Sequence, residues 1–248
     1  MASTTETGHA KNVATFEDLI SFCTGYGATY NPSKATLKTT ALTAQLTAAN
    51  TALQNVRTTK TAYDNATNAR EIAFKPLKPL ATKIVNALAA TDATEQTLHD
   101  AKTTNNKIQG NRSKAVSKPI ATETTDAPTE AKTVSTSQQS YDKMVDHFAQ
   151  LIATLTAEAK CIPNEAELKL TALNTMLTDL KTKNTAVITA TTAVSNARMA
   201  RDNALYTKGT GLIDTALGVK LYVKSVFGST SPQYKQISGL VFTKSKKA

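Results

Sequence analysis

The 248-residue chain contains an internal repeat. When the sequence is shifted by 131 positions, Pro32 aligns with Pro163 and Arg70 aligns with Arg201. A long internal duplication constrains the architecture before any local propensity is considered, because each copy is one structural unit that needs a neighbour to cover its apolar side. Further residues of the first copy that keep their identity under this shift are Leu37, Lys38, Thr40, Ala41, Leu42, Leu46, Val56, Asn65, Ala66, Ala69 and Ala73.

Each copy is predicted to contain a short helix followed by a long one. The short helix has apolar residues at i, i+3 and i+4, which mark one helical face: Phe16, Leu19 and Ile20 in the first copy, and Phe148, Leu151 and Ile152 in the second. The segments 33–75 and 164–208 contain neither glycine nor proline. They therefore predict helices of about 40 residues, about 60 Å long, that begin at the N-caps Ser33 and Asn164.

The long helices carry a seam of residues whose steps alternate between four and three, which is typical of helices that pack nearly parallel. A polar residue in such a seam, Lys60 or Asn184, can fix the register of packing at a cost in stability, although the lysine can also extend its charge to solvent. The seam comprises Leu42, Leu46, Ala49, Leu53, Val56, Lys60 and Tyr63 in the first copy, and Leu173, Leu177, Leu180, Asn184, Val187, Thr191 and Val194 in the second.

Helix-breaking residues end both long helices at matching places. The first copy has Lys-Pro-Leu-Lys-Pro at 75–79 and the second has Thr-Lys-Gly-Thr-Gly at 207–211, which predicts a turn into a return helix in each. The first copy then continues into a weak helix that ends near Gly110. The second has Ser231 as N-cap and Pro232 at the first helical position, followed by an extended segment at 239–242.

These elements predict an all-α fold. We expect an internally duplicated, elongated, four-helix-bundle-like arrangement of two long helical hairpins related by a pseudo-two-fold axis, with short flanking helices. Repeat 1 spans 13–110 and repeat 2 spans 139–243, and the two pack as one domain. Residues 1–12 are predicted to be disordered, residues 111–138 to be a flexible linker of low hydrophobicity, and residues 244–248 to be a basic tail.

Composition and charge limit the function classes. The net charge is +10, and because it is spread along the chain it favours loose contact with anionic polymers or membranes rather than a nucleic-acid groove. Two cysteines, Cys23 and Cys161, are too few for a disulfide framework. The sequence shows no secretory signal peptide and no apolar run of about 18 residues. We therefore expect a cytoplasmic protein with free thiols, and leaderless export is the alternative.

The matched stretches around the two aligned arginines contain the first candidate site. Both follow the pattern Asn-Ala-x-x-Ala-Arg-acid. The arginines are either equivalent anion- or partner-binding sites, or structural residues that each pair with a carboxylate on a neighbouring helix and set the hairpin register; the structural interpretation is favoured. The candidate residues are Asn65, Arg70 and Glu71 in the first copy, and Asn196, Arg201 and Asp202 in the second.

Aromatic and basic residues near the C-terminus form a second candidate, for binding anions. Interleaved rings and lysines can stack on and neutralise nucleic acid, and they also occur at membrane interfaces. The favoured alternative is that the rings fill the core while the lysines face water. The candidate residues are Lys220, Tyr222, Lys224, Tyr234 and Lys235.

No catalytic, metal or cofactor site is predicted. Glu95 and His99 could share a helical face, but a zinc site needs at least three protein ligands. His147 lies beside an apolar stripe, and Cys161 precedes Pro163, where a small buried side chain is expected. The glycines at 25 and 27 lack a phosphate-loop context. The chain is therefore not expected to be an enzyme or to bind a cofactor.

Two segments carry a resemblance to a known family. The segments FEDLISFCTGYGATYNP at 16–32 and FGSTSPQYKQISGL at 227–240 resemble an uncharacterised family of helical proteins from flavobacterium-like bacteria, over nearly the whole chain. The resemblance implies no activity and no site residues. The expected function is therefore a non-enzymatic structural or protein-interaction bundle that associates with itself or with another protein. The alternatives are a nucleic-acid or anionic-polymer binding protein and a membrane-active helical protein.

Overall fold

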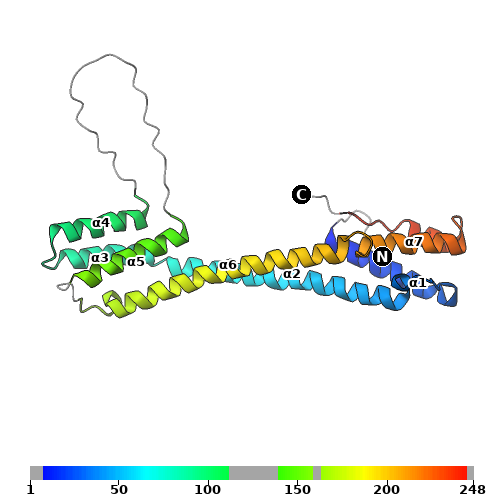
Figure 1. The fold of residues 1–248 in the computed structure, drawn as a ribbon, viewed down its shortest axis with the longest axis horizontal. Coiled ribbons are helices and arrows are strands. Elements are labelled where there is room, and N and C mark those ends of the chain that lie inside the picture. Colours follow the sequence, from blue (N-terminus) through cyan, green and yellow to red (C-terminus); the bar gives the residue numbers. More distant parts are fainter. Residues whose placement is uncertain (1–7, 112–138, 159–162, 245–248) are drawn as a thin grey trace, which may run out of the picture. The chain divides into compact units, whose positions relative to one another are not determined.

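The computed structural model describes residues 8–111, 139–158 and 163–244. These residues form helices joined by turns and contain no strand, which confirms the predicted all-α class (Figure 1). Among the helices of this part of the chain, none is long and apolar enough to cross a membrane. The helices are α1 His9–Gly25, α2 Thr39–Phe74, α3 Leu77–Ala89, α4 Glu95–Gln109, α5 Tyr141–Ala157, α6 Leu170–Tyr206, α7 Leu212–Phe227 and α8 Pro232–Ser238.

The chain divides into two compact units. Unit 1 comprises Met1–Asp64 and Thr189–Ala248, and unit 2 comprises Asn65–Ile188, so the division falls within α2 and within α6. This organisation differs from the predicted one, in which residues 13–110 and 139–243 are the two repeats of one domain. Each unit takes helices from both predicted repeats, because α3 packs with α5 and α7 packs with α1.

Unit 1 is built around α1 and α7, which lie against each other, with α8 packed on both (Figure 1). The predicted stripe of Phe16, Leu19 and Ile20 on α1 is buried in the core of this unit. The N-terminal part of α2 and the end of α6 complete it. The remaining buried core residues are Val13, Cys23, Tyr30, Leu37, Leu42, Ala49, Leu205, Leu212, Ile213, Ala216, Val219, Val223 and Ile237.

Unit 2 is built around α3, α4 and α5, in which α4 packs on both of the others (Figure 1). The second predicted stripe, Phe148, Leu151 and Ile152 on α5, is buried here. The end of α2 and the first part of α6 contribute Phe74, Leu173 and Leu180, among others. The remaining buried core residues are Leu77, Ala81, Ile84, Val85, Leu88, Ala101, Ile108, Val145, Leu155 and Leu168.

Both long helices begin later than predicted, so Ser33 and Asn164 are not their N-caps. A short 3-10 turn precedes each long helix, at Ala35–Leu37 and at Ala166–Leu168, and α2 and α6 start only at residues 39 and 170. The turn buries Leu37 and Leu168 in the two cores. Burial of a leucine contributes about 2 kcal/mol, which favours the turn over a further turn of solvated helix.

The predicted turns after the long helices are confirmed. Helix α2 ends at Phe74 before the prolines, and α6 ends at Tyr206 before the glycines. Gly209 has a φ of 82°, a left-handed conformation that favours glycine. The Asp214 carboxylate of α7 accepts a hydrogen bond from the Gly209 backbone N–H at 2.7 Å, and this bond fixes the turn.

Several threonines are tolerated in the long helices because their hydroxyls find a partner within the helix, whereas the hydroxyl of Thr67 on α2 is buried without a hydrogen-bond partner among the described residues. On exposed faces the hydroxyl donates to the carbonyl oxygen four residues earlier. Such bonds leave no unsatisfied hydroxyl, but they add little to helix stability, so α2 and α6 depend on their buried side chains. The bonds are made by Thr43, Thr47, Thr51, Thr59, Thr61, Thr175, Thr178 and Thr182.

The prediction of a disordered N-terminus over residues 1–12 is wrong for residues 9–12, which form the first turn of α1. Tertiary packing orders this turn, because Asn12 is fully buried and Val13 belongs to the core of unit 1. Residues 1–7 lie outside the described residues. So does the predicted linker at 111–138 apart from Asn111, and the predicted basic tail at 244–248 apart from Lys244.

Candidate functional site

Arg70 lies in unit 2 and links three helices. Its guanidinium donates a hydrogen bond to the Asn184 amide oxygen on α6 at 3.0 Å, and it stacks on the ring of Tyr141, the first residue of α5, 4.0 Å from the ring centroid. Phe74 packs edge-on against the same tyrosine at 4.7 Å. Cation–π stacking and a charge-assisted hydrogen bond both hold the guanidinium in place.

The Asn184 side chain forms hydrogen bonds to both Arg70 and a carboxylate. This buried seam residue accepts from Arg70 and donates through its amide nitrogen to Asp142 on α5. The expected direct pairing of Arg70 with a carboxylate is therefore wrong. An amide can donate and accept at once, so it connects the two charges across the space between α2 and α5.

Arg201, the aligned residue in unit 1, has a different partner. Its Nε and Nη2 donate to the Asp202 carboxylate at 2.9 and 2.7 Å, and Asp202 is the next residue of the same helix. The expected pairing with a neighbouring helix is wrong here too. The other predicted members of the motif, Asn65, Glu71 and Asn196, are exposed. The structure therefore does not bring the six candidate residues together into one site.

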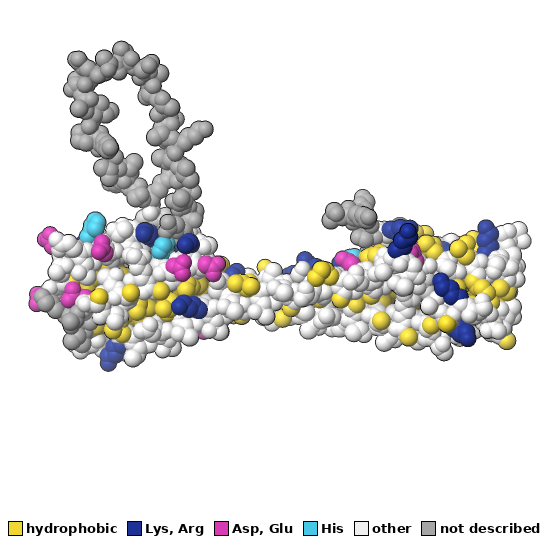
Figure 2. All heavy atoms as spheres, viewed as in Figure 1, with side chains coloured by type: hydrophobic (Ala, Val, Ile, Leu, Met, Phe, Trp, Pro, Cys, Tyr) yellow, Lys and Arg dark blue, Asp and Glu magenta, His cyan; other side chains and the backbone are white. Residues whose placement is uncertain are grey.

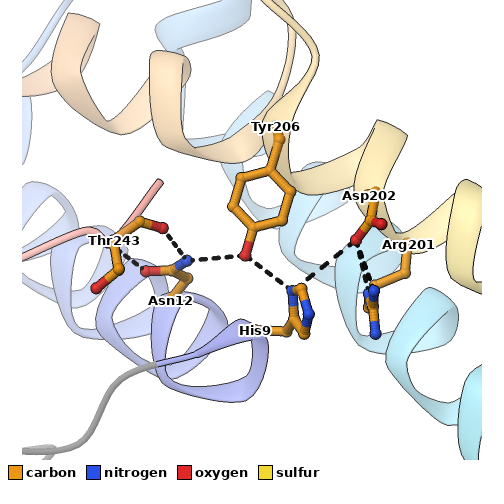
Figure 3. Close-up of polar contacts among 6 residues, drawn as sticks. All are labelled: His9, Asn12, Arg201, Asp202, Tyr206 and Thr243. Carbon is orange, nitrogen blue, oxygen red and sulfur yellow. Dashed lines mark hydrogen bonds and ion pairs between the residues drawn. The ribbon is translucent and has the colours of Figure 1, made fainter. Parts of the chain in front are cut away.

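A polar network beside Arg201 was not predicted from the sequence. His9 Nδ1 lies 2.8 Å from the Tyr206 hydroxyl and 4.0 Å from the Asp202 carboxylate (Figure 3). Burial and the Arg201 charge lower the pKa of His9, whereas Asp202 raises it. Asn12 donates to Tyr206 at 3.4 Å and exchanges two 2.9 Å hydrogen bonds with the backbone of Thr243.

This network fastens the start of α1 to the end of α6 and to the C-terminal segment (Figure 3). The sequence did carry a signal for it: Val13 extends the stripe of Phe16 and Ile20 by one helical turn, which would place Asn12 and His9 on a helix. Nothing in the sequence indicates their partners, because these lie about 200 residues away along the chain.

An open depression of about 510 Å³ lies beside the network in unit 1. Two carboxylates and two ammonium groups line it, so it shows no preference for one ligand charge. The lining residues are Asp202, Asn203, Tyr206, Thr207, Lys208, Ile213, Asp214 and Lys244.

Most of the predicted anion-binding residues have internal partners. Lys220 donates to the carbonyl oxygens of Ser238 and Leu240, and burial lowers its pKa. The Tyr222 hydroxyl accepts from the Asn31 backbone N–H, and its ring lies 5.3 Å from that of Tyr30. These residues hold α7 to the C-terminal segment and to the loop before α2.

The rest of this cluster is closer to solvent. Lys224 and Lys235 are exposed, and the Lys224 ammonium lies 5.8 Å from the centroid of the Tyr234 ring. Tyr234 itself packs against the core of unit 1. The expectation that the rings fill the core and the lysines face water therefore describes Tyr222, Tyr234, Lys224 and Lys235, but not Lys220.

The remaining titratable candidates show no catalytic arrangement. The described residues contain no group of three or more potential metal ligands, and His99 is exposed. Cys23 is buried, and burial raises the pKa of its thiol to about 11. His147 is buried on α5, where burial and Lys107 lower its pKa. Cys161 lies outside the described residues.

Comparison of the chain with protein-family models, with curated proteins and with solved structures finds no match. The resemblance to the uncharacterised helical family stays a prediction.

Proposed function

We propose that this protein is a non-enzymatic helical interaction protein that acts by self-association, through the surface of unit 1 formed by α7. The observation that supports the proposal is the exposure of two large apolar side chains one turn apart: Leu217 is 40% and Leu221 is 68% exposed. Contiguous exposed apolar surface is a mark of protein-binding sites, and these two side chains are neighbours on one side of the helix. In Figure 2 hydrophobic side chains reach the surface in this region of unit 1, next to basic ones.

The internal contacts of the candidate sites also support an interaction role. Arg70 and Arg201 are engaged with Asn184 and Asp202, and Lys220 is engaged with backbone carbonyls. Groups already held in this way contribute to packing within the units. Leu217 and Leu221 on α7, by contrast, are exposed.

We also infer that the chain arose by duplication of one helical hairpin, with a pseudo-two-fold relation between the copies. Matching local details support this: each long helix is preceded by a 3-10 turn and an extended lysine, Lys38 with ψ 144° and Lys169 with ψ 140°. Each unit then combines the short helix of one repeat with the return helix of the other.

Sedimentation velocity of the full chain, from low to high micromolar concentration, tests the proposed self-association. We expect the weight-average sedimentation coefficient to rise with concentration toward that of a dimer, by mass action. A strictly monomeric chain over the whole range contradicts the proposal.

An anionic polymer is the second candidate partner, because Lys224 and Lys235 are exposed beside Tyr234. Fluorescence anisotropy with a mixed-sequence single-stranded oligonucleotide tests it. Binding that weakens steeply with salt supports it. The absence of any anisotropy change at low salt removes it.

A further inference from the structure

Four residues of α7 form one outward face with an ordered pattern. Asp214, Leu217, Leu221 and Lys224 follow one another at steps of three, four and three residues. At 100° per residue, these steps place all four within about 80° of the helix circumference. We call this set the α7 face. The opposite side of the helix carries the buried core residues Leu212, Ala216, Val219 and Val223.

The two charges of the α7 face are not neutralised within the described residues. Neither Asp214 nor Lys224 belongs to an ion pair there. Asp214 accepts one backbone hydrogen bond, from Gly209, and a carboxylate can accept several more. The Lys224 ammonium lies over the Tyr234 ring, 5.8 Å from its centroid, and the residue is exposed. Both charges are therefore available to a partner.

The α7 face of one copy is complementary to that of a second copy in the antiparallel orientation. Val219 is its midpoint: Leu217 and Leu221 lie two residues on either side, and Asp214 and Lys224 lie five residues on either side. We infer that a second copy of this chain docks here, with the two α7 helices antiparallel about a two-fold axis at Val219. This inference rests on the proposed function and specifies the surface that carries it.

In this dimer each leucine meets its counterpart and each charge meets its opposite. Leu217 packs on the partner's Leu221. Asp214 pairs with the partner's Lys224. The two-fold axis repeats both contacts. A two-fold interface must be self-complementary in this way. A nucleic acid or an anionic membrane would instead be repelled by Asp214, so the pattern favours a second copy over either of them.

The proposed interface is small. Each copy contributes two leucines and two charges, so the whole interface has two ion pairs and buries less surface than a permanent dimer requires, which is typical of weak, reversible association. A single substitution removes both ion pairs, because the two-fold axis repeats the same pair at both ends of the interface. Like charges placed opposite each other discriminate strongly against a pairing.

Two charge-reversal variants test the pairing. Lys224→Glu places Asp214 opposite a glutamate at both ends of the interface, and Asp214→Lys places Lys224 opposite a lysine at both ends. We expect either variant alone to dimerise at least about tenfold more weakly than the wild type. An equimolar mixture of the two variants restores both opposite-charge pairs in the mixed dimer, so we expect wild-type association to return.

Lys235→Glu is the matched control, because it changes the net charge equally on the exposed surface of unit 1 outside the α7 face. Sedimentation velocity should show wild-type dimerisation for it. If the wild type dimerises and both α7 variants dimerise equally well, or if their mixture is not rescued, the α7 pairing is wrong while self-association stands. A wild type that stays monomeric overturns both.

Asp214→Lys also removes the hydrogen bond to Gly209, so its helicity and melting temperature are compared with the wild type first. Leu221→Asp provides an independent test that leaves that turn intact. Its control is Ile72→Asp, since Ile72 is similarly exposed (71%) but lies in unit 2. Weaker dimerisation of Leu221→Asp alone supports the α7 pairing, and equal behaviour of the two variants contradicts it.

Discussion

At the scale of single residues, identity between aligned positions of the sequence does not give the same contacts. Arg70 and Arg201 align, yet Arg70 reaches across to α6 and α5 whereas Arg201 pairs within its own helix. The difference comes from the neighbours. Asn184 aligns with Leu53 under the shift of 131 positions, so the position that gives Arg70 its amide partner carries no amide in the segment aligned with it.

Arg70→Ala should therefore destabilise the protein more than Arg201→Ala. The first change removes a stacked, charge-assisted hydrogen bond and leaves the Asn184 oxygen buried without that donor, which costs about 1–3 kcal/mol. The second removes an ion pair within one helix in which Arg201 is 15% and Asp202 is 45% exposed, which costs about 1 kcal/mol. Urea unfolding followed by circular dichroism measures both. Equal losses, or a larger loss for Arg201→Ala, would show that Arg70 has no special structural role.

His147 should make stability depend on pH. Its Nε2 atom is buried and has no hydrogen-bond partner among the described residues, and Lys107, Lys143 and Asp146 surround it. Burial and the two lysines lower its pKa below 6.5, and Asp146 opposes them. As pH falls below 6.5 the unfolded chain therefore takes up a proton first, and the folded state loses stability.

His147→Leu should remove this loss. The measurement is the free energy of unfolding at several pH values from neutral to about 5, where an unperturbed histidine becomes charged. His9→Leu is the control, because the pKa of His9 is also lowered but its removal leaves the His147 contribution in place. The explanation fails if the free energy of unfolding of His147→Leu falls toward acid pH as much as that of the wild type.

At the scale of elements, a polar cluster joins the end of α4 to Gln139, which lies two residues before α5. The Gln139 side chain donates to the Lys107 carbonyl oxygen at 2.7 Å and accepts from the Lys78 ammonium at 3.0 Å. Gly110 ends α4 with a φ of 82°, and a Cβ there would lie 2.9 Å from the Gln139 side chain. Glycine thus serves both the left-handed conformation and the close approach.

Gly110→Ala should destabilise this junction more than Gly209→Ala. Both glycines have a φ of 82°, so both variants carry the left-handed strain of about 1–2 kcal/mol. Only at Gly110 does the new methyl group also displace Gln139, because nothing lies within 4 Å of a Cβ at Gly209. Hydrogen exchange of the α4 and α5 amides beside the junction measures the effect. Similar protection in both variants would mean that the Gln139 contacts add nothing.

At the scale of the whole molecule, each unit has its own hydrophobic core. No buried residue belongs to both cores, although α2 and α6 contribute to each. Leu77 begins α3 in one core and Leu212 begins α7 in the other, and both are fully buried. These two leucines allow a matched comparison of the units.

Leu77→Ala should weaken unit 2 and Leu212→Ala should weaken unit 1. Each leaves a cavity, which costs about 2–5 kcal/mol. Hydrogen exchange should then show lost protection in α3 and α5 for the first variant, and in α1 and α7 for the second. Loss of protection in all four helices with either variant would indicate one cooperative core instead of two.

The sequence by itself predicted the elements well, because their signals are local. Apolar spacing predicted α1, α5 and the long helices, and the prolines and glycines predicted their ends, since a backbone restriction acts wherever it occurs. Ser231 at the start of α8 is a confirmed example: its side chain accepts from the Tyr234 backbone N–H. The α7 face can also be identified in the sequence, because its two leucines and its two opposite charges are spaced symmetrically about Val219.

Tertiary structure decided which segments share a core and where each helix starts. The start of α1 depends on Thr243, and the late start of α2 depends on the burial of Leu37. The partners of Arg70 and Lys220 likewise come from other elements. Such contacts join residues far apart in the chain, and their free energy is gained only when the fold brings those residues together, so no local pattern can encode them.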